Sequence, residues 1–186
     1  MKIACCGSSG GGKTTLANLL ANHLELTEAI TYSRPTAAAR AMGYQRANEV
    51  PPAEMWRFQW LALFEQLVAE RMGSYGGWFV ADRSVLDFAA YHLFQRPGAK
   101  ASDDYVRLAG EHARSTYHLL VVVPPNSHGT EDDGKRHLHG VHEVHAILLD
   151  LLARFGLNGR TINLTTDTPD ERAREVLVTL RERGLR

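Results

Sequence analysis

The sequence is poor in cysteine and has no excess of charge of either sign. Its 186 residues include two cysteines, and 21 basic side chains balance 21 acidic ones, so the formal net charge is zero. Cys5 and Cys6 are neighbours, and neighbouring residues on a strand point to opposite faces. We therefore interpret them as reduced core residues of a cytoplasmic protein, not as a redox pair. The zero net charge also gives no support for a nucleic-acid binder driven by electrostatic attraction.

Long hydrophobic runs are missing as well. No apolar run approaches the ~20 residues that span a bilayer, so no membrane partner is expected. The MKIACC segment at the start reaches glycine after four apolar residues, which is too few for a secretory signal core. Hydrophobic residues nonetheless make up 44% of the chain, a share typical of globular proteins. These features predict one soluble, intracellular domain over residues 1–186.

Short apolar segments alternate with amphipathic ones along the chain. Buried strands are expected over residues 3–6, 29–33, 78–81, 118–123 and 161–164. Helices are expected over residues 14–26, 37–42, 51–75, 86–94, 103–114, 141–155 and 169–183, the last capped by Thr168 or Asp167. Strands separated by helices pair in parallel through crossovers. The order therefore predicts an α/β three-layer sandwich with a five-stranded parallel sheet.

The helix expected over residues 51–75 has an apolar stripe. Its members recur at helical spacing and are Trp56, Trp60, Leu63, Leu67 and Val68. A stripe of this kind normally faces the core of the protein, so we predict that these side chains are buried.

Residues 7–14 read GSSGGGKT and match the phosphate-loop pattern G-x-x-x-x-G-K-[ST] at every fixed position. Glycines let successive backbone N–H groups turn toward a phosphate, and the following helix adds its positive N-terminal end. Lys13 is expected to reach the β and γ phosphates of ATP, and the Thr14 hydroxyl to ligate Mg²⁺. The predicted nucleotide-binding residues are Gly7, Ser8, Ser9, Gly10, Gly11, Gly12, Lys13, Thr14 and Thr15.

Two motifs of switch GTPases, D-x-x-G and N-K-x-D, are absent from the sequence. The chain is also shorter than a large motor ATPase. A small ATP-dependent kinase fits best, because phosphoryl transfer needs mainly positioning, a metal ion and cationic clamps.

Three further segments resemble the phosphate-loop nucleoside and nucleotide kinases. Asp82-Arg83-Ser84, after the strand expected over 78–81, resembles the D/E-R-[SYH] motif of thymidylate and deoxynucleoside kinases. The WRFQ segment at 56–59 resembles part of the substrate helix of deoxynucleoside kinases. The DGKR segment at 133–136 resembles the D-G-x-R segment that precedes the lid in relatives of nicotinamide riboside kinases.

The resemblance implies that Asp82 and Arg83 lie beside the phosphate loop, at the carboxyl end of a strand where ligands bind in open α/β sheets. Asp82 is expected either to hold Mg²⁺ together with Thr14 or to accept the proton of an attacking hydroxyl, and both roles stay open. Arg83 is expected to orient the acceptor or the transferring phosphate. The alternative for Arg83 is a surface ion pair with Asp87.

The acceptor side is expected to use Arg34, Phe58, Gln59 and Arg83. Arg34 stands in a Ser-Arg-Pro turn that lacks the glutamate of the R-E-P turn of thymidylate kinases. Phe58 would stack on a base, and Gln59 would pair with its edge. Arg136 lies in the polar segment 126–140, the expected lid, and would bring a cation to the phosphates. The predicted catalytic set is Lys13, Asp82, Arg83 and Arg136.

Four histidines cluster in the HLHGVHEVH segment: His137, His139, His142 and His145. Imidazole suits zinc, but the spacing is one residue short of the H-E-x-x-H pattern and no cysteine lies nearby. We assign no metal to this cluster and leave its role open.

The sequence therefore predicts an enzyme that uses ATP and Mg²⁺ to phosphorylate a nucleoside or a (deoxy)nucleoside monophosphate. One alternative acts on a hydroxymethylated base or an end within DNA, although the neutral charge argues mildly against it. Another is a nucleotide-dependent regulatory ATPase module. Related kinases are often dimers, so the resemblance also allows a homodimer.

Overall fold

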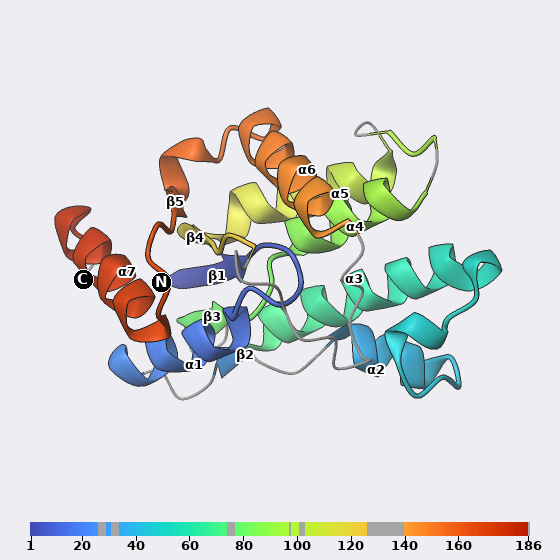
Figure 1. The fold of residues 1–186 in the computed structure, drawn as a ribbon, viewed down its shortest axis with the longest axis horizontal. Helices are drawn as coiled ribbons and strands as arrows, with labels where there is room; N and C mark the ends of the chain where they lie inside the picture. The colour runs from blue at the N-terminus through green and yellow to red at the C-terminus, as the bar shows by residue number, and fades with distance from the viewer. Residues whose placement is uncertain are drawn as a thin grey trace.

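The computed structural model describes residues 1–25, 29–30, 34–73, 77–96, 98–100, 103–125 and 140–185, with only the backbone at 29–30. Strands and helices alternate along these residues, and the helices cover both faces of a parallel sheet (Figure 1). The predicted α/β architecture with a parallel sheet is therefore confirmed.

The sheet has the order β2-β3-β1-β4-β5, and each neighbouring pair of strands is parallel. The strands are β1 (Lys2–Cys6), β2 (Ala29–Ile30), β3 (Phe79–Ala81), β4 (Leu119–Val122) and β5 (Thr161–Asn163). Four strands have three to five residues, whereas the edge strand β2 has two; residues 31–33, also expected there, lie outside the described residues. Ala4 of β1 pairs with Ala81 of β3, so the carboxyl ends of these two strands are neighbours.

Helices form a layer on each face of the sheet. They are α1 (Lys13–His23), α2 (Arg34–Ala41), α3 (Met55–Gly73), α4 (Val85–Gln95), α5 (Asp104–Thr116), α6 (Val141–Arg154) and α7 (Pro169–Glu182). Ile3 and Cys5 of β1 pack with α1 and α7, whereas Ala4 and Cys6 pack in the core formed with α2 to α6. Both cysteines are free and fully buried, which confirms that they are core residues.

Local sequence signals set several helix boundaries. The Ser84 side chain caps α4 by accepting from the backbone N–H of Asp87 at 3.3 Å. Thr168 caps α7 in the same way, with Pro169 at the first helical position, as predicted. Three short 3₁₀ turns complete the described elements: Ala47–Glu49, Pro52–Glu54 and Asn158–Arg160. Within the described residues, no helix has the length and apolar character that a bilayer span requires.

The prediction that the apolar stripe of α3 is buried is wrong for three of its members. Trp56, Trp60 and Val68 are 57%, 38% and 43% exposed, whereas Leu63 is fully buried. The buried face of α3 instead carries Phe58, Gln59, Ala62, Leu63, Gln66 and Glu70. Periodicity located the helix but not its inward side, because buried hydrogen bonds make polar side chains acceptable in the core.

Candidate active site

The loop between β1 and α1 depends on glycine. Gly7 and Gly12 have φ angles of +138° and +88°, a region that side-chain-bearing residues rarely adopt. A Cβ atom on Gly7 would also collide with the carbonyl oxygen of Val123, which follows β4. Because α1 begins at Lys13, its N-terminal end adjoins the loop, and this arrangement favours anion binding.

A buried carboxylate holds the start of this loop. The backbone N–H of Gly7 donates to Oδ1 of Asp87 at 2.7 Å, and Asp87 is 1% exposed. The other carboxylate oxygen, Oδ2, accepts from the backbone N–H and the hydroxyl of Ser84, both at 2.7 Å. Asp87 thus joins the first turn of α4 to the loop. It is not the surface partner of Arg83 that the sequence left open.

Lys13 folds its side chain back over the loop. Its Nζ donates to the carbonyl oxygen of Ser8 at 2.5 Å, and the residue is 5% exposed. Burial, followed by the nearby charge of Arg83, lowers the pKa of Lys13 to about 8. A bound phosphate would supply negative charge that compensates for the lost hydration of this ammonium group.

Thr14 and Asp82 meet at the carboxyl ends of β1 and β3. The Thr14 hydroxyl donates to Oδ2 of Asp82 at 2.6 Å. Burial raises the pKa of Asp82, although Thr14, Arg83 and Lys13 all favour its charged form. A hydroxyl and a carboxylate are hard oxygen ligands of the kind that Mg²⁺ takes beside phosphate oxygens. The pair therefore suits the Mg²⁺ site expected from the sequence.

Tyr91 of α4 links Arg83 to the phosphate loop. Its hydroxyl oxygen accepts from the backbone N–H of Ser9 at 3.1 Å and shares a hydrogen bond with the Ser9 hydroxyl at 2.8 Å. The guanidinium of Arg83 lies 5.8 Å from the centre of the Tyr91 ring, within cation–π range, and its Nη2 lies 3.5 Å from Oγ of Ser9. The cation predicted to orient the acceptor is therefore held beside the loop.

A buried carboxylate on α3 forms hydrogen bonds with three side chains near the turn that carries Arg83. Glu70 is fully buried, and its Oε1 accepts from the Tyr117 hydroxyl and from Nε2 of Gln66, each at 2.7 Å. Nε2 of His112 lies 2.7 Å from the other oxygen, Oε2. A buried polar group needs hydrogen-bond partners of this kind to be tolerated in the core.

The same side chains hold the backbone on both sides of Ser84. Gln66 donates a second bond, 3.1 Å long, to the carbonyl oxygen of Arg83. The Tyr117 hydroxyl accepts from the backbone N–H of Val85 at 2.9 Å. Sequence reasoning missed this network, and its signal was weak: Gln66 and Glu70 stand one helical turn apart on a helix whose apolar spacing predicted another inward face.

Arg172 joins α7 to the phosphate loop and was also missed. It is 4% exposed, its Nη1 donates to the carbonyl oxygen of Gly11 at 2.6 Å, and its Nε donates to that of Thr166 at 2.8 Å. In the sequence it is one arginine of a charged helix, and nothing local distinguishes it from Arg174.

The acceptor residues predicted on α3 lie inside the protein. Phe58 and Gln59 are 6% and 2% exposed. Nε2 of Gln59 donates to Oε1 of Gln95 on α4 at 2.5 Å, and the Tyr105 hydroxyl donates to the Gln59 carbonyl at 3.0 Å. For Gln59 to read a base, its bond to Gln95 would have to exchange for one to the ligand. Arg34 is half-buried at the start of α2.

The predicted lid cation, Arg136, lies outside the described residues, as do His137 and His139. His142 is exposed and His145 half-buried, both near the start of α6. Among the residues that the structure describes, no group of three or more His, Cys, Asp or Glu side chains is placed to hold a metal ion.

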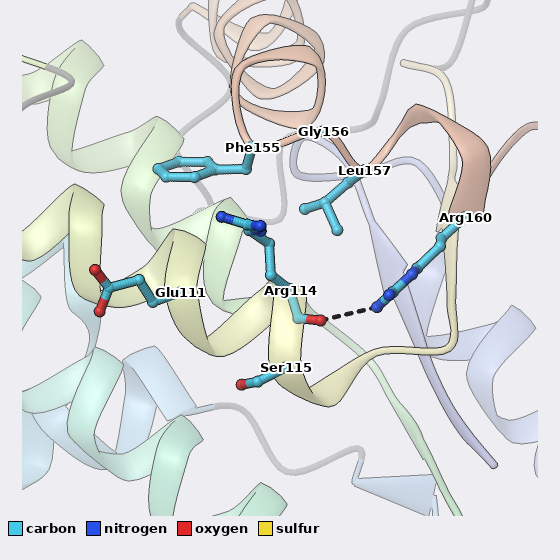
Figure 2. A pocket seen from close by; sticks show the side chains of 7 residues that line it. All are labelled: Glu111, Arg114, Ser115, Phe155, Gly156, Leu157 and Arg160. Atoms are coloured by element: carbon cyan, nitrogen blue, oxygen red, sulfur yellow. Dashed lines mark hydrogen bonds between the residues drawn. The ribbon is translucent and has the colours of Figure 1, made fainter.

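A hollow of about 480 Å³ lies at the end of the sheet opposite to the phosphate loop (Figure 2). It is lined by Glu111, Arg114, Ser115, Phe155, Gly156, Leu157 and Arg160. These residues belong to the end of α5, just before β4, and to the segment that leads into β5. They therefore lie at the amino ends of strands, whereas the phosphate loop follows the carboxyl end of β1, and the hollow is separate from the candidate active site.

A family model described as AAA domain matches residues 2–172. A search of curated protein sequences returns no match.

Several solved structures share the fold at low sequence identity. The NadR protein in complex with NAD and AMP-PNP matches with a TM-score of 0.66 and 18% identity, over 100% of this chain and 50% of that one. The chain thus spans half the length of NadR. Deoxyadenosine kinase from M. mycoides matches with a TM-score of 0.64 and 10% identity, over 98% and 100% of the two chains. Thymidylate kinase from Candida albicans matches with a TM-score of 0.63 and 14% identity, over 98% and 92%.

Proposed function

The chain belongs to the AAA domain family, and we propose that it is an ATP-dependent phosphotransferase acting on a nucleoside or a (deoxy)nucleoside monophosphate. Its fold is that of the phosphate-loop kinases, as the sequence resemblance predicted.

The hydrogen bond between Thr14 and Asp82, 2.6 Å long, carries this proposal. It joins the hydroxyl of the phosphate loop to a carboxylate from the neighbouring strand. A loop that only bound a phosphate would not need that carboxylate, whereas phosphoryl transfer needs a metal ion held beside the phosphates. The contact supports ATP and Mg²⁺ as the cofactors.

Each residue of the site has a distinct proposed task. The loop N–H groups and Lys13 would bind the β and γ phosphates, and Thr14 and Asp82 would hold Mg²⁺. When bound, Mg²⁺ neutralises charge on the phosphate oxygens. Arg83, positioned by Tyr91, would orient the acceptor or stabilise the transferring group. If Asp82 is not a metal ligand, it would instead take the proton of the attacking hydroxyl.

The neighbours of the fold and the position of Arg83 support a nucleoside or a nucleotide as the acceptor. The deoxyadenosine kinase structure holds dCMP and dCDP, and a second NadR structure is in complex with NR. A hydrogen bond from Gln66 to the carbonyl oxygen of Arg83 joins the Asp82-Arg83-Ser84 turn to α3, the helix that also carries Phe58 and Gln59. A nucleoside or nucleotide hydroxyl is therefore the acceptor that we propose.

The direct test is ADP release from Mg·ATP with a panel of acceptors. The panel holds nucleosides, nucleoside monophosphates, nicotinamide riboside, and DNA with normal or hydroxymethylated pyrimidines. Strong stimulation by one small acceptor is expected and would identify it. Stimulation by DNA alone would favour the kinase that acts within DNA. Slow hydrolysis that no acceptor stimulates would favour the regulatory module.

Asp82→Asn is expected to lower turnover by more than ~100-fold while weakening ATP binding far less, because Asp82 acts on the metal ion or on the acceptor. Turnover and ATP affinity are measured separately, with Asp150→Asn, an exposed aspartate of α6, as the matched control. A raised Mg²⁺ requirement would identify a metal ligand, and an unchanged one a base. Unchanged turnover would reduce Asp82 to a structural residue.

A further inference from the structure

The hollow shown in Figure 2 is lined by two arginine side chains from different elements. Arg114 belongs to α5, and Arg160 ends the 3₁₀ turn that leads into β5. Within the described part of the chain, the guanidinium of Arg114 has no hydrogen bond or ion pair. Glu111, the acidic residue of the lining, is already paired with Arg107 at 3.1 Å. The hollow therefore has positive charge that the protein itself does not compensate.

The backbone on one side of the hollow holds Arg160 in place. Its Nη1 donates to the carbonyl oxygens of Arg114 at 2.8 Å and of Tyr117 at 3.2 Å. Its Nε and Nη2 have no partner among the residues that the structure describes. These two nitrogens form one edge of the planar guanidinium, and such an edge matches two oxygens of a phosphate or a carboxylate. Because the side chain is already ordered, binding an anion costs little conformational entropy.

The end of α6 provides a fixed apolar wall. Two backbone hydrogen bonds close this helix, from the N–H of Gly156 at 3.0 Å and from that of Leu157 at 2.9 Å, in the pattern of a Schellman motif. The ring of Phe155 packs on Gly110 of α5, where any Cβ atom would collide with it. Phe155 is only half-buried, so part of its ring is left to cover a flat apolar group.

The surroundings of the hollow are positive as well. Arg183, which follows α7, donates to the carbonyl oxygens of the residues on either side of Arg160, at 3.1 and 3.2 Å. Burial lowers the pKa of His118, just before β4, and the positive charges of the Met1 amino group, Lys2 and Arg160 lower it further. An anion is therefore attracted to this end of the sheet, although the net charge of the whole chain is zero.

We propose that the hollow is a second ligand site, which binds a small organic phosphate with a flat apolar part. Its volume of about 480 Å³ lies within the ~300–1,000 Å³ of small-molecule pockets. A phosphate monoester carries nearly two negative charges at neutral pH, so it matches the charges of Arg114 and Arg160 better than a carboxylate does. Phe155 and Leu157 cover the apolar part of the ligand.

An NMR titration of the full chain with phenyl phosphate tests the proposal, because this probe joins a phosphate monoester to a single flat ring. The backbone amide signal of Gly156 reports on the hollow, and that of Gly12 reports on the phosphate loop in the same titration. The Gly156 signal is expected to shift with a dissociation constant below ~1 mM. A signal that does not move up to ~10 mM, or a shift confined to Gly12, would overturn the proposal.

Two variants test the roles of the arginines. Arg114→Gln is expected to raise the dissociation constant at Gly156 by at least ~10-fold, because a charged donor is lost while no printed contact of the fold is broken. Arg160→Gln is expected to weaken binding at least as much. Arg181→Gln, at an exposed position of α7, is the matched control and should bind like the wild type. Unchanged binding in both Arg114→Gln and Arg160→Gln would refute the site.

Two further ligands test the chemical class. Inorganic phosphate is expected to bind at least ~10-fold more weakly than phenyl phosphate, because it lacks the apolar part that Phe155 covers. Benzoate is expected to bind more weakly too, since it carries a single negative charge. Equal affinity for inorganic phosphate would rule out the apolar part, and tighter binding of benzoate would rule out the phosphate. None of these titrations measures phosphoryl transfer, so this site and the proposed function can fail independently.

Discussion

At the scale of single residues, Lys13 combines burial with charge. Only 5% of it is exposed, and its Nζ is hydrogen-bonded to a neutral carbonyl oxygen, that of Ser8. The protonated form is therefore less stable in the folded, nucleotide-free protein than in the unfolded chain, as its lowered pKa indicates. The desolvated ammonium group of Lys13 therefore lowers the stability of the nucleotide-free protein, and a bound anion would offset this loss.

Lys13→Met is expected to raise the free energy of unfolding of the nucleotide-free protein by ~1–3 kcal/mol at neutral pH. Methionine fills a similar volume without a charge to desolvate. The same variant should lose the stabilisation that Mg·ATP gives the wild type, because the phosphate clamp is gone. Urea unfolding with and without Mg·ATP measures both effects.

The pH dependence of the difference in stability between Lys13→Met and the wild type identifies its cause. Between pH 8 and 10.5 the folded lysine has released its proton while the unfolded one, with its ordinary pKa, still holds it. The unfolded state then binds more protons, so wild-type stability rises with pH through this window and the advantage of Lys13→Met shrinks. Lys100→Met, at an exposed position, should show no such trend. An advantage of Lys13→Met that is constant from pH 7 to 10.5 would contradict the explanation.

At the scale of secondary-structure elements, the turn between β3 and α4 is held by its neighbours. Side chains on α3 and at the end of α5 bond its backbone at Arg83 and Val85. Glu70 in turn fixes both of those side chains, Gln66 and Tyr117. The position of Arg83 therefore depends on the packing of two helices that do not carry it.

Tyr117→Phe is expected to lower the free energy of unfolding by ~2–3 kcal/mol, because the N–H of Val85 and an oxygen of Glu70 lose a buried partner. It should also lower turnover more than ATP affinity, since the turn that carries Arg83 loosens. Tyr44→Phe is the matched control, because it removes a hydroxyl that donates to Glu54 at 2.9 Å at a half-buried site. Its cost should stay below ~1 kcal/mol. Equal losses in the two variants would exclude a special role for the network.

Arg172→Leu tests the contact between α7 and the phosphate loop. It removes the donors to the carbonyl oxygens of Gly11 and Thr166. The expected result is a nucleotide affinity about tenfold weaker and a loss of ~2 kcal/mol in stability, because buried carbonyl groups lose a charged donor. Isothermal titration and urea unfolding provide the measurements. Arg174→Leu, exposed on the same helix, should change stability by no more than ~0.5 kcal/mol.

At the scale of the whole molecule, the two helix layers meet at the phosphate loop. Asp87 of α4, in one layer, binds the backbone of Gly7, and Arg172 of α7, in the other layer, binds that of Gly11. A ligand that orders the loop should therefore stabilise contacts on both faces of the sheet.

Hydrogen exchange followed by mass spectrometry measures this coupling. Mg·ATP is expected to slow exchange in α4 and α7 together, because both helices bond to the loop that the phosphates order. The end of α6 lies next to Phe155, at the end of the sheet opposite to the phosphate loop. It serves as the internal control, and its exchange rate should change little. Protection confined to α1 would show that the loop is not coupled to the two layers.

The sequence by itself determined the phosphate loop, the order of strands and helices along the chain, the parallel sheet and the cap at Thr168. These features depend on local physics: the φ angle that Gly12 must adopt, the spacing of apolar residues, and a hydroxyl that accepts from an N–H three residues later. Asp82 could be proposed because the Asp82-Arg83-Ser84 segment resembles a kinase motif and follows a predicted strand, at the end of the sheet where ligands bind.

Only the tertiary structure decided which helix faces turn inward and which distant residues hold the site. Gly7 and Asp87 are 80 residues apart, and Gly11 and Arg172 are 161 apart. In neither pair does a local sequence pattern identify which distant residue forms the contact. The inward face of α3 was misjudged for the same reason: hydrogen-bond partners such as Tyr117 and Gln95 make Glu70 and Gln59 acceptable in the core, and those partners come from other elements. Burial depends on what the rest of the chain places opposite a residue, and folding alone brings those residues together.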